Sequence, residues 1–299
     1  LFAAGLTFNW RPPEGALLPD AVAIARQADL SVVFIGLSPE LEGEEMPVHV
    51  EGFAGGDRTS IDLPAPQEQL LMTLAASGKP LVVVLMNGSA LAVNAAQQHA
   101  AAVLEAWYPG ESGGQAIAET VSGKNDPGAR LPVTFYASTN QLPPFDDYAM
   151  HNRTYRFFTG EPLYRFGYGL SYTQFAYSNL HISPETFARD NTVTVEADLR
   201  NTGSVAGDEV AQLYLTTPPY PTAPVYALRA FQRISLAPGE TRRLSFKLSP
   251  RQLSAVNEDG SRSILAGDYK VAVGGGQPVS GFNGVKGTFS TTQASALPN

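Results

Sequence analysis

Short apolar runs in the first half of the chain alternate with stretches of helical character. The runs are rich in valine, leucine and isoleucine and cover residues 32–36, 81–86, 101–106 and 131–135. The helical stretches cover residues 21–28, 67–77 and 114–122. Continuous apolar strands separated by helices are typical of a parallel sheet that is covered on both faces. Residues 1–137 are therefore predicted to form an α/β domain with a mostly parallel sheet.

The pattern changes after about residue 174. Apolar and polar residues now alternate in the segments 192–199, 209–215, 241–248 and 269–273, with Gly- and Asn-containing turns between them. This spacing predicts an all-β domain over residues 174–299, an immunoglobulin-like or fibronectin type III-like β-sandwich. The stretch between the domains, residues 138–173, is rich in proline and aromatic residues, which favours an ordered connector over a flexible linker.

The composition of the chain argues against two classes of binding partner. The 299 residues carry 28 acidic and 20 basic side chains, a net charge of −8, without a Lys/Arg cluster that could follow phosphates or anionic lipid. Neither nucleic acid nor a membrane is therefore expected as a partner. The chain has no cysteine and only 4 scattered histidines, so we expect no metal site.

The chain does not begin with methionine, and its first residues lack the basic start of a signal peptide. No apolar stretch approaches the roughly 20 residues that span a bilayer. We therefore expect position 1 to be an interior point of a longer precursor. The lack of cysteine is compatible with the cytosol or the periplasm as the compartment. We favour a periplasmic or secreted protein, with any export signal upstream.

An acidic loop follows the first apolar run. Residues 40–45 read Glu-Leu-Glu-Gly-Glu-Glu and lead into Asp57 and Arg58. Open α/β sheets expose a crevice at the carboxyl ends of their parallel strands, where the surroundings of a carboxyl group can raise its pKa for proton transfer. The loop therefore has the character of half an active site.

Several stretches together resemble a known family. Residues 106–114 (Ala-Trp-Tyr-Pro-Gly-Glu-Ser-Gly-Gly), 128–135 and 166–172 are similar to the C-terminal half of glycoside hydrolase family 3, which includes β-glucosidases and β-xylosidases. Residues 200–210 and 236–241 resemble the fibronectin type III-like domain of that family. The likeness runs in order from about residue 20 to residue 275.

The resemblance implies a domain order of barrel, α/β sandwich domain and fibronectin type III-like domain. It also implies a retaining mechanism, in which the barrel supplies a nucleophilic aspartate and the sandwich domain an acid/base glutamate. The family's nucleophile motif does not occur in this chain. We therefore expect a barrel segment, in the same precursor or in a second chain, to complete an exo-acting enzyme for terminal β-D-glucosyl or β-D-xylosyl residues. The hydrolysis implied by the resemblance requires no cofactor. The sandwich domain would also lack its first strands and expose an apolar edge.

Among the clustered glutamates, Glu42 best matches the family's acid/base position, with Glu44 as the alternative after a register shift. Glu40, Glu45 and Glu51 are expected to be solvated, because crowded carboxylates repel one another and normally face water. The competing interpretation is that the whole run is a solvated acidic loop or a weak cation site. The alternating Asn/Asp pattern of a calcium loop is absent.

We expect structural rather than catalytic roles for several other residues of the α/β domain. Asp57 and Arg58 match the family motif and are expected to support the loop. Trp107 and Tyr108 could stack on a sugar, but core packing is the favoured interpretation. Ser89 is expected to cap the helix that follows it.

A different class of function stays open. The chain could be a non-catalytic carbohydrate-binding or scaffolding remnant that lacks the barrel. In that case chemistry would not constrain Glu42. The discriminating observation is whether a barrel sequence is encoded immediately upstream or copurifies.

Overall fold

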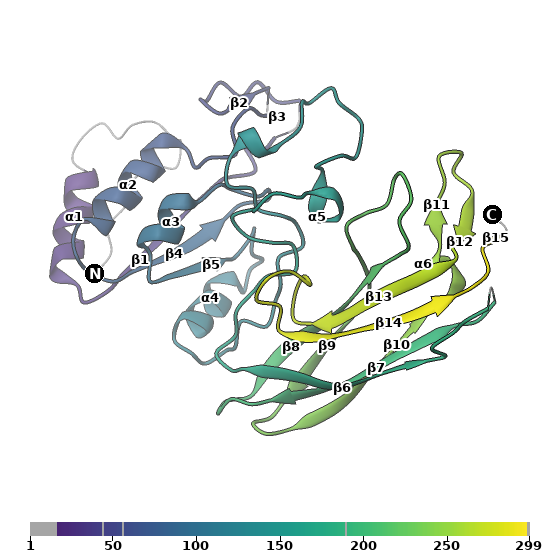
Figure 1. The fold of residues 1–299 in the computed structure, drawn as a ribbon. Helices are drawn as coiled ribbons and strands as arrows, with labels where there is room; N and C mark the ends of the chain where they lie inside the picture. Colours follow the sequence, from purple (N-terminus) through teal and green to yellow (C-terminus); the bar gives the residue numbers. More distant parts are fainter. Residues whose placement is uncertain (1–16, 44, 56, 189, 298–299) are drawn as a thin grey trace. The chain divides into compact units, whose positions relative to one another are not determined.

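The structure, a computed structural model, describes residues 17–297 apart from residues 44, 56 and 189 (Figure 1). The chain divides into two compact units. The first comprises Leu1–Ala118, Phe135–Leu142 and Glu161–Tyr164, and the second Glu119–Thr134, Pro143–Gly160 and Arg165–Asn299. The sequence connector is thus divided between the units. The domain boundaries at residues 137/138 and 173/174 stay a prediction.

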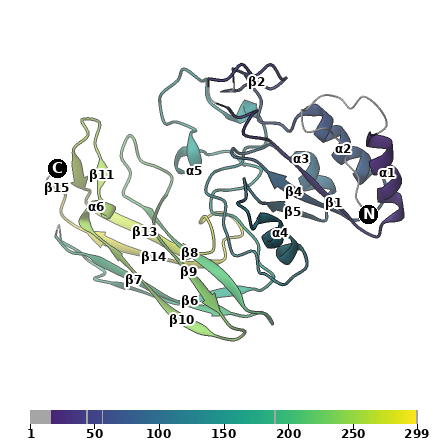
Figure 2. The same ribbon diagram turned by 180° about the vertical axis from the view of Figure 1, so that it is seen from behind.

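The first unit is built on a three-stranded parallel sheet of order β1-β4-β5. In chain order its elements are α1 (Leu17–Gln27), β1 (Ser31–Gly36), β2 (Phe53–Ala54), β3 (Asp57–Arg58), α2 (Ala65–Ala75), β4 (Leu81–Met86), α3 (Asn94–His99), β5 (Ala102–Glu105), α4 (Gly113–Val121) and η1 (Thr139–Gln141). Helices α2 and α3 lie on one side of the sheet and the start of α4 lies on the other (Figures 1 and 2).

The apolar runs form the core of this unit because their side chains pack against α2. Buried residues from β1, β4 and α2 make one hydrophobic cluster, among them Val33, Ile35, Leu71, Leu81, Val83 and Leu85. The outward side chains of β1 differ from expectation: Val32 is 40% and Phe34 55% exposed, so β1 is covered on one face only. Val32 and Phe34 lie on a face of the sheet, and the apolar edge expected from the sequence stays a prediction.

The prediction of a fourth strand in this sheet, over residues 131–135, is wrong. Only Phe135 forms an isolated bridge, with Tyr164. Leu131 pairs separately, its amide donating to the Tyr168 carbonyl at 2.8 Å. Pro132 lies between these two points and has no amide hydrogen, so a continuous ladder cannot form.

The carboxyl end of β1 is fixed by two contacts that a generic strand would lack. Gly36 has φ +143, and a Cβ there would lie 2.0 Å from the Met86 carbonyl oxygen. The buried Gln67 amide of α2 accepts from the Gly36 N–H at 2.7 Å and donates to the Gly36 carbonyl at 2.8 Å. Both bonds are buried, so the loop that follows β1 starts from a fixed point.

The second unit is mainly antiparallel β-structure. Its elements are α5 (Thr154–Phe157), β6 (Phe175–Ser183), β7 (Val193–Asn201), β8 (Gly207–Thr216), β9 (Ala227–Leu236), β10 (Thr241–Leu248), α6 (Pro250–Leu253), β11 (Ala255–Val256), β12 (Arg262–Ile264), β13 (Gly267–Gly274), β14 (Gly284–Thr291) and β15 (Ser295–Leu297). The sheets have the orders β10-β7-β6, β14-β13-β8-β9 and β11-β12-β15. Alternate residues of these strands make one apolar core that includes Val195, Leu213 and Val271. The predicted class, α/β followed by an all-β sandwich, is confirmed.

Aromatic residues before β6 are ordered within the second unit. The ring of Tyr155 in α5 stacks on Phe166 with a centroid distance of 4.2 Å. Its hydroxyl accepts a hydrogen bond of 3.0 Å from the Leu228 amide of β9. These contacts attach Tyr155 and Phe166 to the strands of the second unit.

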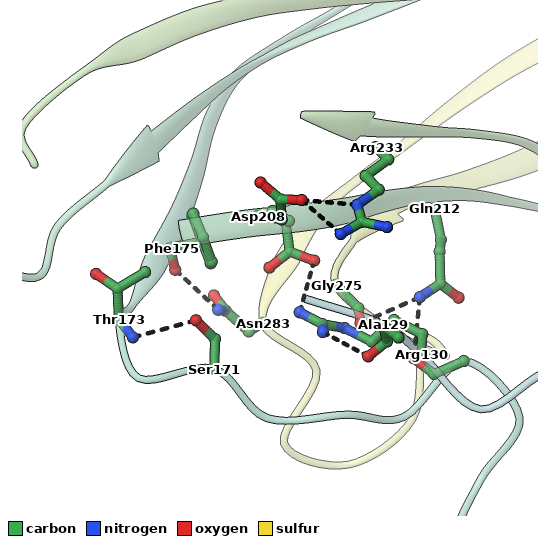
Figure 3. Close-up of polar contacts among 12 residues, drawn as sticks. Ala129, Arg130, Ser171, Thr173, Phe175, Asp208, Gln212, Arg233, Gly275 and Asn283 are labelled. Carbon is green, nitrogen blue, oxygen red and sulfur yellow. Dashed lines mark hydrogen bonds and ion pairs between the residues drawn. The ribbon is translucent and has the colours of Figure 1, made fainter. Parts of the chain in front are cut away.

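A buried ion pair joins the start of β8 to the segment before β6. The Arg130 guanidinium lies 3.2 Å from the Glu209 carboxylate, and both side chains are less than a tenth exposed. Figure 3 shows Arg130 beside the more exposed pair of Asp208 and Arg233. Burial raises the pKa of Glu209, while Arg130 acts in the opposite direction.

No helix among the described residues is long and apolar enough to cross a bilayer.

Candidate active site

The loop after β1 carries Glu42 at the carboxyl edge of the parallel sheet. Two buried leucines, Leu37 and Leu41, anchor the loop to the core of the first unit. The amides of Leu41 and Glu42 both donate to the Ser38 carbonyl, at 3.0 and 3.1 Å. This tight turn presents a half-buried Glu42 next to the loops that follow β4 and β5.

Both oxygens of the Glu42 carboxylate accept hydrogen bonds from these loops. The Gly88 amide donates to Oε2 at 2.9 Å. The Ser89 hydroxyl donates to Oε1, and the Tyr108 hydroxyl donates to Oε2. We call these three groups the Glu42 donors. They fix the orientation of a carboxylate that would otherwise rotate freely in a loop.

The space around Glu42 admits only a glycine at position 88. A Cβ on Gly88 would lie 2.8 Å from the Tyr108 ring and 3.0 Å from Glu42 Oε2. Burial and the bond to Glu42 raise the pKa of Tyr108 above its ordinary range, so its hydroxyl remains a donor at physiological pH.

Arg58, in β3, reaches the same cluster. Its guanidinium donates to the Ser60 and Asp62 carbonyls, at 2.8 and 3.2 Å, and to the Ser89 hydroxyl oxygen at 3.1 Å. It also lies over the Phe53 ring, 5.1 Å from the centroid. Burial lowers the pKa of Arg58 and Glu42 opposes this shift. The contacts are those of a loop anchor that also holds Ser89.

A second carboxyl group, half-buried like Glu42, lies at the same edge. Glu105 ends β5; its Oε1 accepts from the Trp107 amide at 2.9 Å and its Oε2 from the Asn87 side-chain amide at 3.2 Å. The same Asn87 nitrogen donates to the Ser89 carbonyl at 3.0 Å. Burial raises the pKa of Glu105 to about 7, although both hydrogen bonds act in the opposite direction. Sequence reasoning missed Glu105 because it forms part of an ordinary apolar run.

The raised pKa of Glu105 should make the stability of the protein depend on pH. Between its ordinary pKa of 4.5 and its folded value of about 7, the folded protein retains a proton that the unfolded chain has lost. Unfolding free energy should therefore decrease as pH rises through this window, by roughly 1–3 kcal/mol. Urea titrations of wild type and Glu105→Gln across the window would measure it. The glutamine variant should lack this part of the decrease, and parallel curves for the two proteins would contradict the assignment.

The other acidic residues of the loop are placed differently. Glu40, Glu45 and Glu51 are exposed. Glu44, the alternative acid/base, lies outside the described residues. The Asp57 side chain is exposed on the β2–β3 ribbon.

Two expectations from sequence are corrected. Ser89 does not cap the next helix, because α3 starts at Asn94 with Val93 at the cap position; its hydroxyl binds Glu42 instead. Trp107 packs edge-on against Phe135 at 6.0 Å, as core packing predicts, but the neighbouring Tyr108 is 40% exposed and binds Glu42. The left-handed backbone of Trp107, φ +54, turns Tyr108 out of the core.

Within the described residues, no group of three or more His, Asp or Glu side chains is placed to hold a metal ion.

The family model named glycosyl hydrolase family 3 C-terminal domain matches residues 13–172, more than half of the chain. The chain belongs to glycosyl hydrolase family 3. A model named fibronectin type III-like domain matches residues 209–277, within the second unit. The resemblance inferred from sequence motifs is confirmed.

Named relatives within family 3 agree. A xylan 1,4-β-xylosidase of Xylanibacter ruminicola is 41% identical over 246 residues, which cover 81% of this chain and 28% of the relative. A periplasmic β-glucosidase of Salmonella typhimurium is 35% identical, with coverage of 92% and 36%. A solved β-glucosidase structure from Erythrobacter marinus aligns with a TM-score of 0.80 at 32% identity, with coverage of 92% and 36%. The chain thus spans about a third of the length of these relatives.

Proposed function

We propose that the chain is the acid/base portion of an exo-acting retaining β-glycosidase. Glu42 acts as general acid and base, and a barrel segment supplies the nucleophile. The observation that carries the proposal is the fixed Glu42 carboxylate, which accepts from Gly88, Ser89 and Tyr108 at the carboxyl edge of the sheet. Membership in family 3 supports the same reading.

The chemistry needs two carboxyl groups about 5 to 5.5 Å apart. In the first step the nucleophile attacks the anomeric carbon while protonated Glu42 gives its proton to the leaving oxygen. In the second step the Glu42 carboxylate takes a proton from water, and this water displaces the nucleophile. The Glu42 donors hold the carboxyl group in one place for both steps. Net retention follows from two inversions.

The proposed substrates carry a terminal non-reducing β-D-glucosyl or β-D-xylosyl residue. Relatives are named as β-xylosidase and β-glucosidase, which supports both sugars. The proposed compartment is the periplasm or the extracellular space, in line with the relative that is named as periplasmic.

Asp57 and Arg58 are proposed to support the loop rather than to bind sugar. The three carbonyl and hydroxyl contacts of Arg58 favour this role. Asp57 holds the short ribbon at the end of the loop through its backbone pairing with Ala54.

The experiment that tests the function is hydrolysis of aryl β-glucosides and β-xylosides by the protein expressed from the genomic reading frame that contains these residues. Intact-mass analysis of the same sample identifies the polypeptides present. We expect activity with retention of configuration, seen by NMR of the first-formed sugar, and a barrel segment in the active sample. An inactive sample that contains the barrel segment would contradict the proposal. A genome without any barrel sequence upstream would favour the non-catalytic alternative.

A further inference from the structure

We propose that Glu105 is a positioning residue for Glu42, because its carboxyl group ties together the two turns that carry the Glu42 donors. The inference rests on the proposed function and extends it to a residue outside the acidic loop. Glu105 does not touch the reacting atoms in this reading. It acts through the backbone of its neighbours.

The two turns follow adjacent strands. Residues 87–89 follow β4 and supply the Gly88 amide and the Ser89 hydroxyl; residues 107–108 follow β5 and supply the Tyr108 hydroxyl. Glu105 is bonded to both turns. One oxygen accepts from the Trp107 amide and the other from the Asn87 side chain.

Asn87 extends the link into the first turn. It is fully buried, and one side-chain nitrogen donates both to Glu105 and to the Ser89 carbonyl. A buried amide that bridges a carboxylate and a turn carbonyl fixes the backbone of that turn. The Ser89 hydroxyl and the Gly88 amide then have defined directions toward Glu42.

The second turn, residues 107–108, contains a backbone conformation that a hydrogen bond must hold in place. Trp107 has φ +54, a backbone region that bulky L-residues rarely adopt. The bond from its amide to Glu105 holds this conformation, and the next residue is Tyr108. Loss of the bond would let the Trp107 backbone relax and would move the Tyr108 hydroxyl away from Glu42.

The test compares Glu105→Gln with Glu111→Gln, a matched change at an exposed residue of the loop after β5. Glutamine keeps the size of Glu105 but turns one acceptor oxygen into a donor, so one of the two bonds fails. We expect kcat/KM to fall about 10- to 100-fold for phenyl β-glycosides, whose poor leaving group needs a well-placed acid. For dinitrophenyl glycosides, which leave without protonation, kcat/KM should stay within about twofold. Asn87→Ser should show the same selectivity, and Glu111→Gln should match wild type.

A second readout does not depend on catalysis. Hydrogen exchange should become faster in Glu105→Gln for the backbone amides of Gly88, Trp107 and Tyr108, and should not change in Glu111→Gln. Unchanged exchange at these amides would overturn the proposal, and so would an equal loss of kcat/KM for both leaving groups. Glu42→Gln is measured in parallel: if it shows no leaving-group selectivity, the proposed function fails, while the exchange data still decide whether Glu105 holds the turns.

Discussion

Glu42→Gln should lower kcat/KM for phenyl β-glycosides by about 10²- to 10⁴-fold, the range typical of a lost general acid. Glutamine keeps the shape of the side chain, and its one oxygen can still accept from part of the Glu42 donors, but its amide has no acidic proton to give. Dinitrophenyl glycosides should lose much less in kcat/KM. Their kcat should fall strongly, because the second step still needs a base to activate water.

Glu45→Gln is the matched control, since Glu45 is an exposed glutamate of the same loop. It should retain the wild-type kcat/KM for both leaving groups. If Glu45→Gln showed the selective loss and Glu42→Gln did not, the acid/base assignment would be wrong. Glu44→Gln, measured in the same series, tests the alternative position.

Arg130→Met should lower the unfolding free energy by about 3–5 kcal/mol near pH 8, because it leaves the buried Glu209 carboxylate without its cation. The loss should be smaller near pH 5. Burial already raises the pKa of Glu209, and removal of Arg130 removes a group that lowers it, so the carboxyl group can take up a proton there. Urea unfolding at both pH values measures the difference.

A double variant separates pairing from packing. Arg130→Met with Glu209→Leu removes both charges and should restore most of the stability that the single variant loses. Arg233→Met is the control: its pair with Asp208 is largely exposed, with Arg233 62% accessible, and should change stability by about 0–1 kcal/mol. A double variant as unstable as Arg130→Met alone would show that the charges are not the cause.

Periodicity predicted the fold where a strand is a single apolar run. Residues 81–86 are buried on nearly every side chain and form β4 with the expected bounds. Residues 131–135 are also largely apolar but contain Pro132, and their partners Tyr164 and Tyr168 are distant in sequence. Pattern alone cannot show that backbone pairing is confined to two separate points, Leu131 and Phe135.

The sequence predicted where Glu42 lies in the fold, while its role as acid and base stays a proposal. Glu42 follows the end of a buried strand, which both topology and family resemblance indicate. The roles of Ser89, Tyr108 and Glu105 depend on how the ends of three parallel strands come together, and on the left-handed backbone at Trp107. No local sequence signal marks such a backbone on a tryptophan, so these residues were assigned to a helix cap, to the core or to a strand.

The most direct measurement is azide rescue of Glu42→Ala with dinitrophenyl β-glucoside in the protein expressed from its genomic reading frame. The glycosyl intermediate should form at a near-normal rate, and azide, which needs no base, should accelerate turnover and give a β-glycosyl azide that NMR identifies. Rescue in Glu42→Ala, with none in Glu45→Ala, is the result that the account predicts. A Glu42→Ala variant that hydrolyses phenyl and dinitrophenyl glycosides as wild type does, without any azide product, would contradict it.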